Sequence, residues 1–218
     1  MKSKLIIVGL GGSMAKVSRS RAALVSALEG AARAGAETEL LDIRELDLPM
    51  YNPDDDRPAE ATARLIESCH AADGMLWSSP MYQGTISGAL KNALDWLHLL
   101  RDRDSPFLHD KVIGLISAAG GMQGLQAINT MEFAVRALRG WAVPYVVPVA
   151  AAARVFDADG RIRDQAVGLQ LNTLGEEVVR VAEKFASDHS LHREAECARA
   201  AERVASTAGT PPGVPPAS

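Results

Sequence analysis

Short apolar runs alternate with longer amphipathic segments between residues 5 and 187 of the chain. The apolar runs have the length of β-strands, whereas the amphipathic segments repeat apolar residues every three or four positions, as α-helices do. The last segment shows this period most clearly, because Leu171, Leu174 and Val178 lie on one helical face. The pattern predicts strands at residues 5–10, 38–41, 74–78, 112–117 and 143–149, and helices at residues 20–34, 59–72, 87–100, 125–138 and 164–187.

Repeated strand–helix–strand units predict an α/β fold with a parallel sheet. Because crossovers between parallel strands are right-handed, the simplest arrangement is a doubly wound, five-stranded sheet with helices on both faces. We expect the strand order 2-1-3-4-5, which is one of the two common orders for such sheets. A chain of 218 residues is long enough for one domain of this kind with a full core.

The composition changes after the last of these helices. Ala, Arg and Glu dominate first, and the chain then ends in Pro-Pro-Gly-Val-Pro-Pro-Ala-Ser. We therefore expect a domain over residues 1–187 and a second segment over residues 188–218, which begins as a helix and ends as a proline-rich tail. A tail of this composition cannot form a core of its own, and we expect it to dock on a neighbouring subunit.

The charge and hydropathy of the chain exclude several classes of partner. Lys and Arg are scattered and the formal net charge is −4, so no basic surface for a nucleic acid is expected. Residues 1–12 lack the pattern of a signal peptide, and no apolar run approaches the roughly 18 residues of a membrane-spanning helix. We expect a cytoplasmic protein that has no nucleic-acid or membrane partner.

The cysteines and the acidic residues predict neither a disulfide framework nor a metal site. Cys69 and Cys197 are far apart, and Cys69 shares a predicted helical face with Leu65, which indicates a position in the core. Residues 54–56 are consecutive aspartates in a proline-rich loop at residues 46–58. They lack the spacing of a calcium-binding loop and a histidine partner, so a solvated turn is the favoured interpretation.

The clearest sign of a ligand site is the segment at residues 78–92, which joins a buried strand to an amphipathic helix. Ligands of open parallel sheets lie just beyond the carboxyl ends of the strands, where this segment begins. Pro80 removes one amide, and Gly84 and Gly88 let the backbone approach a ligand closely because they lack a Cβ atom. Ser87 is positioned to cap the helix that follows. These features predict a loop that contacts a flat ring.

Two ligand chemistries compete for the segment that follows the first strand. Gly9 and Gly11 match the start of a dinucleotide-binding fingerprint, with Asp42 at the end of the second strand as its ribose ligand. Met14 occupies the third glycine position, however, and the segment is too long for the tight turn of that fingerprint. The alternative, which we favour, is an anion site at a helix N-terminus where phosphate contacts Ser13, Ser18, Arg19 and Ser20. Simple capping of the helix by Ser18 or Ser20 is a third interpretation.

A second glycine-rich turn follows the fourth strand and contains Gly120, Gly121, Met122 and Gln123. The carboxyl ends of parallel strands meet at one sheet edge, so three strand-end loops converge there. The cleft between them has a phosphate-binding end and a flat, glycine-lined end. A phosphorylated planar heterocycle fits such a cleft, whereas a sugar phosphate would leave the apolar loop without a role.

These motifs resemble those of the NAD(P)H-dependent FMN reductase family of flavodoxin-like proteins. The resemblance covers residues 4–185, and its most specific part is Ser79-Pro80-x-Tyr82-x-Gly84 followed by Gly-Ala-Leu-Lys-Asn-Ala-Leu-Asp-Trp at residues 88–96. Gly12-Ser13 with Ser18-Arg19-Ser20 is similar to the phosphate loop of the sulfonate-linked flavin reductases. Family members commonly have an arginine where this chain has Ala15, with Lys16 and Arg19 nearby, and Gln83 also departs from many relatives.

The resemblance implies an FMN-dependent oxidoreductase that takes hydride from NADPH or NADH. It implies that the FMN phosphate lies on Ser13, Ser18, Arg19 and Ser20, and that the ring lies between two loops formed by Pro80, Met81, Tyr82, Gln83 and Gly84, and by Gly120, Gly121, Met122 and Gln123. It also implies a homodimer or homotetramer and a small-molecule electron acceptor such as free flavin, a quinone, an azo compound or a metal oxyanion.

No side chain is predicted to act as an acid or base, because the flavin itself performs hydride transfer. Tyr82, Gln83 and Gly121 are interpreted as positioning groups, although packing of Tyr82 beneath its loop is an equal alternative. A flavodoxin-type electron carrier is the competing function. Such carriers usually have a strongly acidic docking face, so a net charge of only −4 favours the enzyme. A serine esterase is disfavoured because Pro80 occupies the position whose amide would form the oxyanion hole.

Overall fold

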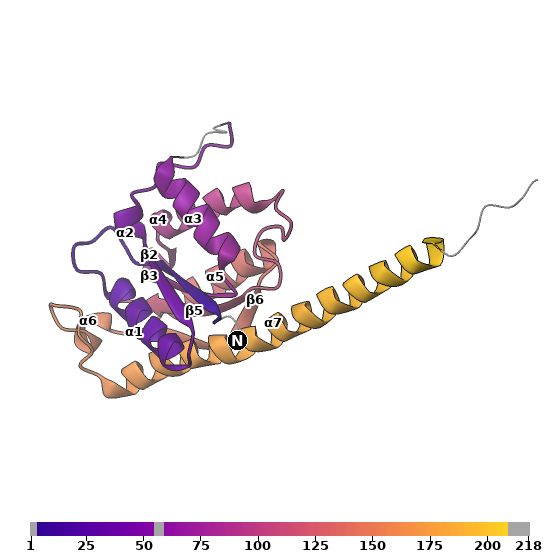
Figure 1. Cartoon of the computed structure of the whole chain (residues 1–218). Coiled ribbons are helices and arrows are strands. Elements are labelled where there is room, and N and C mark those ends of the chain that lie inside the picture. The colour runs from indigo at the N-terminus through magenta and orange to yellow at the C-terminus, as the bar shows by residue number, and fades with distance from the viewer. Residues whose placement is uncertain (1–3, 55–58, 209–218) are drawn as a thin grey trace, which may run out of the picture. The chain divides into compact units, whose positions relative to one another are not determined.

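The computed structural model describes residues 4–54 and 59–208 and contains one parallel sheet with helices around it (Figure 1). The strands are β1 (Ile6–Gly11), β2 (Glu37–Asp42), β3 (Gly74–Tyr82), β4 (Thr85–Ile86), β5 (Val112–Ala118) and β6 (Trp141–Val149). The helices are α1 (Arg19–Arg33), α2 (Ile43–Leu46), α3 (Glu60–Ala71), α4 (Gly88–Trp96), a 3₁₀ turn at Leu97–Leu100, α5 (Leu125–Ala137), α6 (Ala152–Val155) and α7 (Gln165–Ala208).

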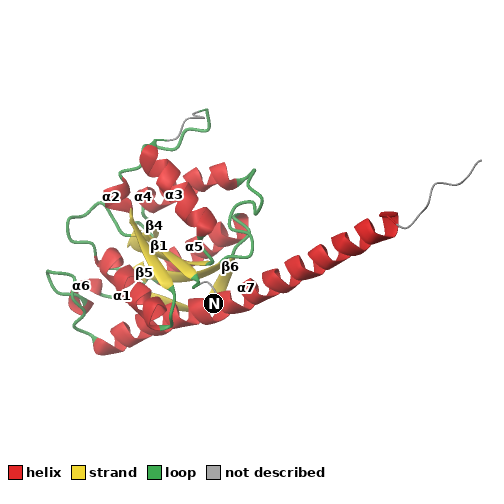
Figure 2. Cartoon of the chain, in the orientation of Figure 1, coloured by secondary structure: helices red, strands yellow, loops and turns green. Residues whose placement is uncertain are grey.

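The strand order confirms the predicted fold. The sheet runs β2-β1-β3-β5-β6, with the short strand β4 paired antiparallel to β3 outside this path. Without β4, the parallel strands follow the predicted order 2-1-3-4-5, and Figure 2 shows the sheet in yellow with helices in red on either side. The register places Gly11 opposite Ser78 and Ser78 opposite Ile116, so the three central strands end at similar heights.

Two layers of helices cover the sheet. Helices α3, α4 and α5 share one apolar cluster with Val8, Met75 and Leu115. On the other face, α1 packs against β1 through Leu24 and Leu28, which lie against Gly9. The first part of α7 lies on that face too, and its Leu174 and Val178 side chains contact the positions of Gly74 and Gly114. Glycines on the strands therefore leave room for the large side chains of α1 and α7.

Helices α1 and α7 approach each other closely where each has a glycine. A Cβ atom on Gly175 would lie 1.9 Å from the carbonyl oxygen of Ala27, and one on Gly30 would lie 2.2 Å from that of Asn172. Real side chains never come this near to backbone oxygen, so both positions require glycine. Glycine in a helix interior normally costs about 1 kcal/mol relative to alanine. The close contact of the two backbones offsets that cost.

The structure adds the short elements α2, β4 and α6, and three of the expected elements differ in extent by more than two residues. Strand β3 continues to Tyr82 instead of ending at residue 78, because its last residues pair with β5 and β4. The helix expected at residues 87–100 changes to a 3₁₀ turn after Trp96. Helix α7 runs from Gln165 to Ala208 in one piece, since no glycine or proline interrupts it after Gly175.

The chain divides into a compact unit at residues 1–183 and a second unit at residues 184–218. The expected docking of the proline-rich tail falls on residues 209–218, which lie outside the described residues, as do two of the three consecutive aspartates. No helix in the described part of the chain has the length and apolar character needed to span a bilayer. Within the same residues, no cluster of three or more His, Cys, Asp or Glu side chains could hold a metal ion.

Cys69 occupies the core position predicted for it. Its side chain is fully buried on α3, and burial raises the pKa of its thiol to about 12. A thiol must ionise to attack a disulfide, so Cys69 is expected to be inert in the native protein. In a Cys197→Ser variant at pH 8, a chromogenic disulfide reagent should label no thiol before denaturation and one thiol per chain after it. Rapid labelling of the native variant would contradict this burial.

Candidate functional site

Three loops meet at the carboxyl edge of the sheet. They follow β1, β3 and β5, which are neighbours in the strand order. The first loop covers residues 12–18, the second lies between β3 and α4, and the third covers residues 119–124. The backbone amide of Gly12 donates a hydrogen bond to the carbonyl oxygen of Ser78, at 3.2 Å, which ties the first loop to the start of the second. The structure thus brings all the predicted site segments to one edge.

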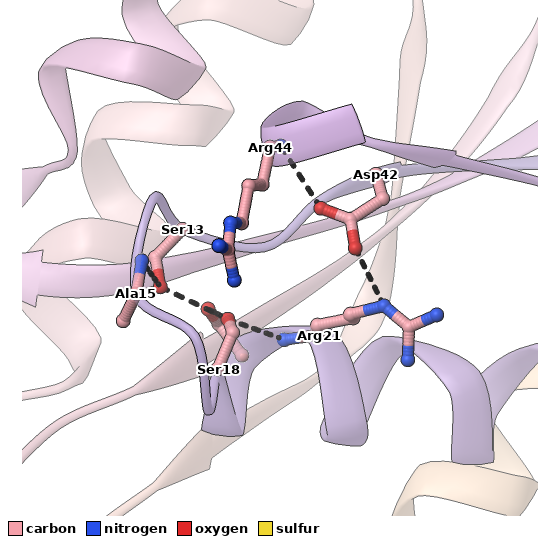
Figure 3. A network of polar contacts seen from close by, with 7 residues as sticks. Ser13, Ala15, Ser18, Arg21, Asp42 and Arg44 are labelled. Carbon is pink, nitrogen blue, oxygen red and sulfur yellow. Dashed lines mark hydrogen bonds and ion pairs between the residues drawn. The ribbon is translucent and has the colours of Figure 1, made fainter. Parts of the chain in front are cut away.

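The first loop contains a connected row of serine hydroxyls (Figure 3). The Ser13 Oγ atom donates to Ser18 Oγ at 3.0 Å, and the Ser18 and Ser20 Oγ atoms lie 3.1 Å apart. The side chains of Ser13 and Ser20 are buried, whereas Ser18 is half-buried. Each hydroxyl has both a donor hydrogen and acceptor lone pairs, so the row can turn its hydrogens toward an anion.

Free backbone amides accompany this row of hydroxyls. Helix α1 begins at Arg19, and none of the amides of residues 16–20 donates to an acceptor within the described residues. Unpaired amides and the dipole of α1 both favour a bound anion at this point. Ser18 also caps α1, because its Oγ accepts the amide of Arg21 at 3.2 Å. The capping and anion-binding interpretations of Ser18 are therefore compatible.

The end of β2 carries charged groups that the favoured phosphate interpretation of the sequence did not include. The Asp42 carboxylate accepts the Nε–H of Arg21 at 2.5 Å through one oxygen and the amide of Arg44 at 3.0 Å through the other. Asp42 is thus engaged by protein groups, which removes the ribose ligand from the dinucleotide interpretation. In Figure 3 the side chain of Arg44 extends from α2 toward the first loop. The predicted strand order indicates this proximity, because β2 lies next to β1 and both strands end at the same edge of the sheet.

The second loop is a tight hairpin rather than an open loop. Tyr82 pairs with Thr85 across a two-residue turn in which Gln83 has φ 48° and Gly84 has φ 83°. Two consecutive positive φ values define the turn type that best joins antiparallel strands. Gly84 adopts its value without strain, whereas Gln83 is a non-glycine residue in the left-handed region. The Tyr82 side chain is 51% exposed, so it does not pack beneath the loop. The hairpin presents Tyr82 and Gln83 to solvent at the sheet edge.

Buried serines hold the second and third loops in place. The Ser79 Oγ atom donates to the carbonyl oxygen of Pro80 at 2.8 Å and accepts the amide of Ser87 at 2.9 Å. The Ser117 Oγ atom donates to the carbonyl oxygen of Gly124 at 2.8 Å. Between these anchors the third loop is exposed, and its Met122 side chain is 85% exposed. Both loops therefore present backbone and flexible side chains on a rigid base.

Polar residues of α4 do not contribute to this edge. Asn92 donates through Nδ2 to the carbonyl oxygen of Pro49 and accepts the amide of Tyr51, both at 2.8 Å, so it ties down the loop after α2 instead of the β3 hairpin. Lys91 pairs with Asp95 at 2.5 Å along the exposed side of the same helix. These residues support the fold around the site.

A doubly wound parallel sheet, with hydroxyls and free amides at the first strand end and two glycine-rich loops beside them, defines the class of flavodoxin-like proteins that bind a phosphorylated ring. The family profile described as NADPH-dependent FMN reductase matches residues 5–154. The chain belongs to the NADPH-dependent FMN reductase family. It is accordingly an FMN-dependent oxidoreductase that uses NADPH.

Individual relatives agree with this family. The chain is 31% identical over 199 residues to the NADPH-dependent FMN reductase ArsH of Shigella flexneri, which covers 91% of this chain and 75% of the relative. It is 38% identical over 109 residues to an NADPH azoreductase of a Bacillus strain, covering 50% of this chain and 58% of the relative. Among solved structures, FerB of Paracoccus denitrificans, a flavoenzyme NAD(P)H:(acceptor) oxidoreductase, has a TM-score of 0.67 at 24% identity, covering 83% of this chain and 98% of FerB.

Proposed function

We propose that the three strand-end loops hold FMN, and that the protein passes electrons from NADPH or NADH through it to a small planar acceptor. The observation that supports this proposal best is the row of Ser13, Ser18 and Ser20 hydroxyls beside the free amides of α1. A phosphate monoester carries a charge of about −1.5 to −2, which such donors stabilise. Arg19, exposed in the first turn of α1, adds a cation to the proposed set.

The proposed ring site lies between the β3 hairpin and the third loop. Its groups are Pro80, Met81, Tyr82, Gln83 and Gly84 on one side, and Gly120, Gly121, Met122 and Gln123 on the other. FMN, when bound, supplies the hydride chemistry, and the protein supplies binding and orientation. Exposed backbone at Gly120 and Gly121 can approach a flat ring, because a Cβ atom is absent there. Tyr82 and Met122 offer flat or flexible apolar contacts to a second planar molecule.

We propose free flavin, a quinone or an azo compound as the electron acceptor. The azoreductase relative acts on azo compounds, as its name states, and its match spans half of this chain. Exposed apolar side chains at the mouth of the proposed site favour an aromatic acceptor over a small hydrophilic one. The alternative function, an electron carrier without its own turnover, is disfavoured by the net charge of −4.

The test is an acceptor panel with purified protein, NADPH or NADH, and FMN in catalytic or substrate amounts. Steady oxidation of NADPH with a quinone or azo compound at catalytic FMN would support the proposal for those acceptors. A rate proportional to added FMN would identify free flavin as the acceptor. Tight flavin binding without NADPH or NADH oxidation would contradict the proposal and favour the electron carrier.

A homodimer or homotetramer is proposed as the assembly. Large apolar side chains are exposed on α5, where Phe133 is 70% and Leu125 is 51% exposed. Large apolar side chains exposed along one helix support a surface that another chain covers. Light scattering coupled to size-exclusion chromatography would decide the oligomeric state, and a monomer at micromolar concentration would contradict the proposal.

A further inference from the structure

A cavity borders the first loop. This α1 cleft has a volume of about 930 Å³ and is lined by Ala15–Ser18, by the exposed side of α1 from Arg21 to Glu29, by Asp42, Arg44 and Glu45 at the end of β2, and by residues 158–162. None of the residues proposed to contact the FMN ring lines it, whereas Ser18, which is proposed to contact the FMN phosphate, does. Cavities of roughly 300–1,000 Å³ are typical of sites for small molecules and cofactors. The α1 cleft therefore has the size of a nucleotide site and adjoins the proposed FMN phosphate site at Ser18.

The positive charges of the α1 cleft are not all neutralised by ion pairs. Arg21 is paired with Asp42 through its Nε atom only, which leaves its terminal nitrogens for a ligand. Arg161 is paired with Asp159 at 3.5 Å. Across the described residues, the guanidinium of Arg44 makes no ion pair and no hydrogen bond, and Figure 3 shows it between the first loop and Arg21. Two guanidinium groups that line the cleft thus keep free donors, that of Arg44 beside the first loop and that of Arg21 beside Asp42.

The acidic residues of the α1 cleft leave this end available to an anion. Both oxygens of Asp42 accept hydrogen bonds from Arg21 and Arg44. Glu29 lies eight residues beyond Arg21 along α1, about 12 Å away at the helical rise, so it faces the other end of the cleft. Glu45 is exposed beside Arg44 on α2. Between the two ends, Val17, Ala22, Val25 and Ile162 add apolar lining.

A phosphate monoester attached to a nucleoside combines the two chemistries that the cleft offers. Guanidinium groups bind phosphate through paired, charge-assisted hydrogen bonds, and the apolar lining suits the flat face of a base. NADPH differs from NADH by one such phosphate, on the adenosine ribose. We infer that the α1 cleft binds the adenosine 2′-phosphate of NADPH, with Arg44 and Arg21 as its phosphate ligands. This inference rests on the proposed function, because it assigns the donor nucleotide of that reaction.

The test measures binding to the FMN-saturated protein by titration calorimetry. The probes are adenosine 2′,5′-bisphosphate, adenosine 5′-monophosphate and inorganic phosphate, and the variants are Arg44→Met and, as a control, Arg33→Met. Arg33 is an exposed arginine at the other end of α1 and does not line the cleft. We expect the bisphosphate to bind at least tenfold more tightly than the other probes. Arg44→Met should remove most of that advantage, Arg33→Met should keep it, and Arg44→Met should raise the KM for NADPH more than that for NADH.

Three results would overturn the inference. Equal binding of the bisphosphate and the monophosphate would show that the 2′-phosphate is not recognised. If inorganic phosphate bound as tightly as the bisphosphate, the cleft would be a general anion site. A loss of FMN affinity in Arg44→Met, with unchanged bisphosphate binding, would assign Arg44 to the FMN phosphate instead. Failure of the proposed function would give a different result from failure of this inference. In that case the unmodified protein would oxidise neither NADPH nor NADH, whatever the calorimetry shows.

Discussion

Replacing Gly175 with alanine is expected to lower the free energy of unfolding by about 3 kcal/mol, or to prevent folding altogether. The new Cβ atom would lie 1.9 Å from the carbonyl oxygen of Ala27 and 2.7 Å from the amide nitrogen of Ala31. Both atoms belong to the backbone of α1, so the clash is relieved only if α1 and α7 move apart. Their separation would open the apolar layer on that face of the sheet. Urea denaturation followed by circular dichroism measures the change.

Gly168→Ala is the matched control on the same helix. A Cβ atom at Gly168 would lie 3.4 Å from the Ile162 Cγ2 atom, which is ordinary van der Waals contact. Alanine favours the helix by about 1 kcal/mol over glycine at both positions, so Gly168→Ala should stabilise the protein slightly. Equal stability of the two variants would contradict the close contact between α1 and α7 at Gly175.

Placing a carboxylate at Ser18 is expected to weaken FMN binding at least about 100-fold, which corresponds to about 2.7 kcal/mol. The negative charge of Ser18→Asp would stand beside Ser13 and Ser20 and repel the FMN phosphate. In the native protein the Ser18 Oγ atom caps α1 by accepting the amide of Arg21 at 3.2 Å. Aspartate ranks with serine as an N-cap residue, so the variant keeps this cap. Quenching of flavin fluorescence on binding gives the affinity for FMN and for riboflavin, which lacks the phosphate.

The neutral variant Ser18→Asn separates charge from loss of the hydroxyl. Asparagine also caps helices well, and it should weaken FMN binding far less than aspartate does. Riboflavin affinity should be nearly the same in all three proteins, because the ring site is not altered. A drop in riboflavin affinity as large as that for FMN, or an unchanged FMN affinity in Ser18→Asp, would show that Ser18 only caps α1.

Much of the fold was predictable because its signals are local. The apolar runs that became β1, β3 and β5 are short and bounded by polar or glycine residues, and α7 repeats apolar residues at helical spacing. The site segments followed from the same strands, since ligands of parallel sheets bind at strand carboxyl ends. The contact of these residues with FMN stays a prediction. The extent of β3 was less predictable, because Pro80 suggests a loop, and only pairing of Pro80 with Ala118 keeps it in the sheet.

The amino-acid sequence alone determined the α/β class, the strand order and the position of a serine-rich loop after β1, because spacing and residue type act over a few neighbouring positions. Only the tertiary structure decided that Arg44 of α2 approaches the first loop and that Arg21 pairs with Asp42. It likewise decided that these three residues line one cleft. It also decided that Gly30 and Gly175 mark a helix contact rather than a helix end. The physical reason is that such contacts join residues far apart in sequence, and their distances depend on strand order, register and helix packing together.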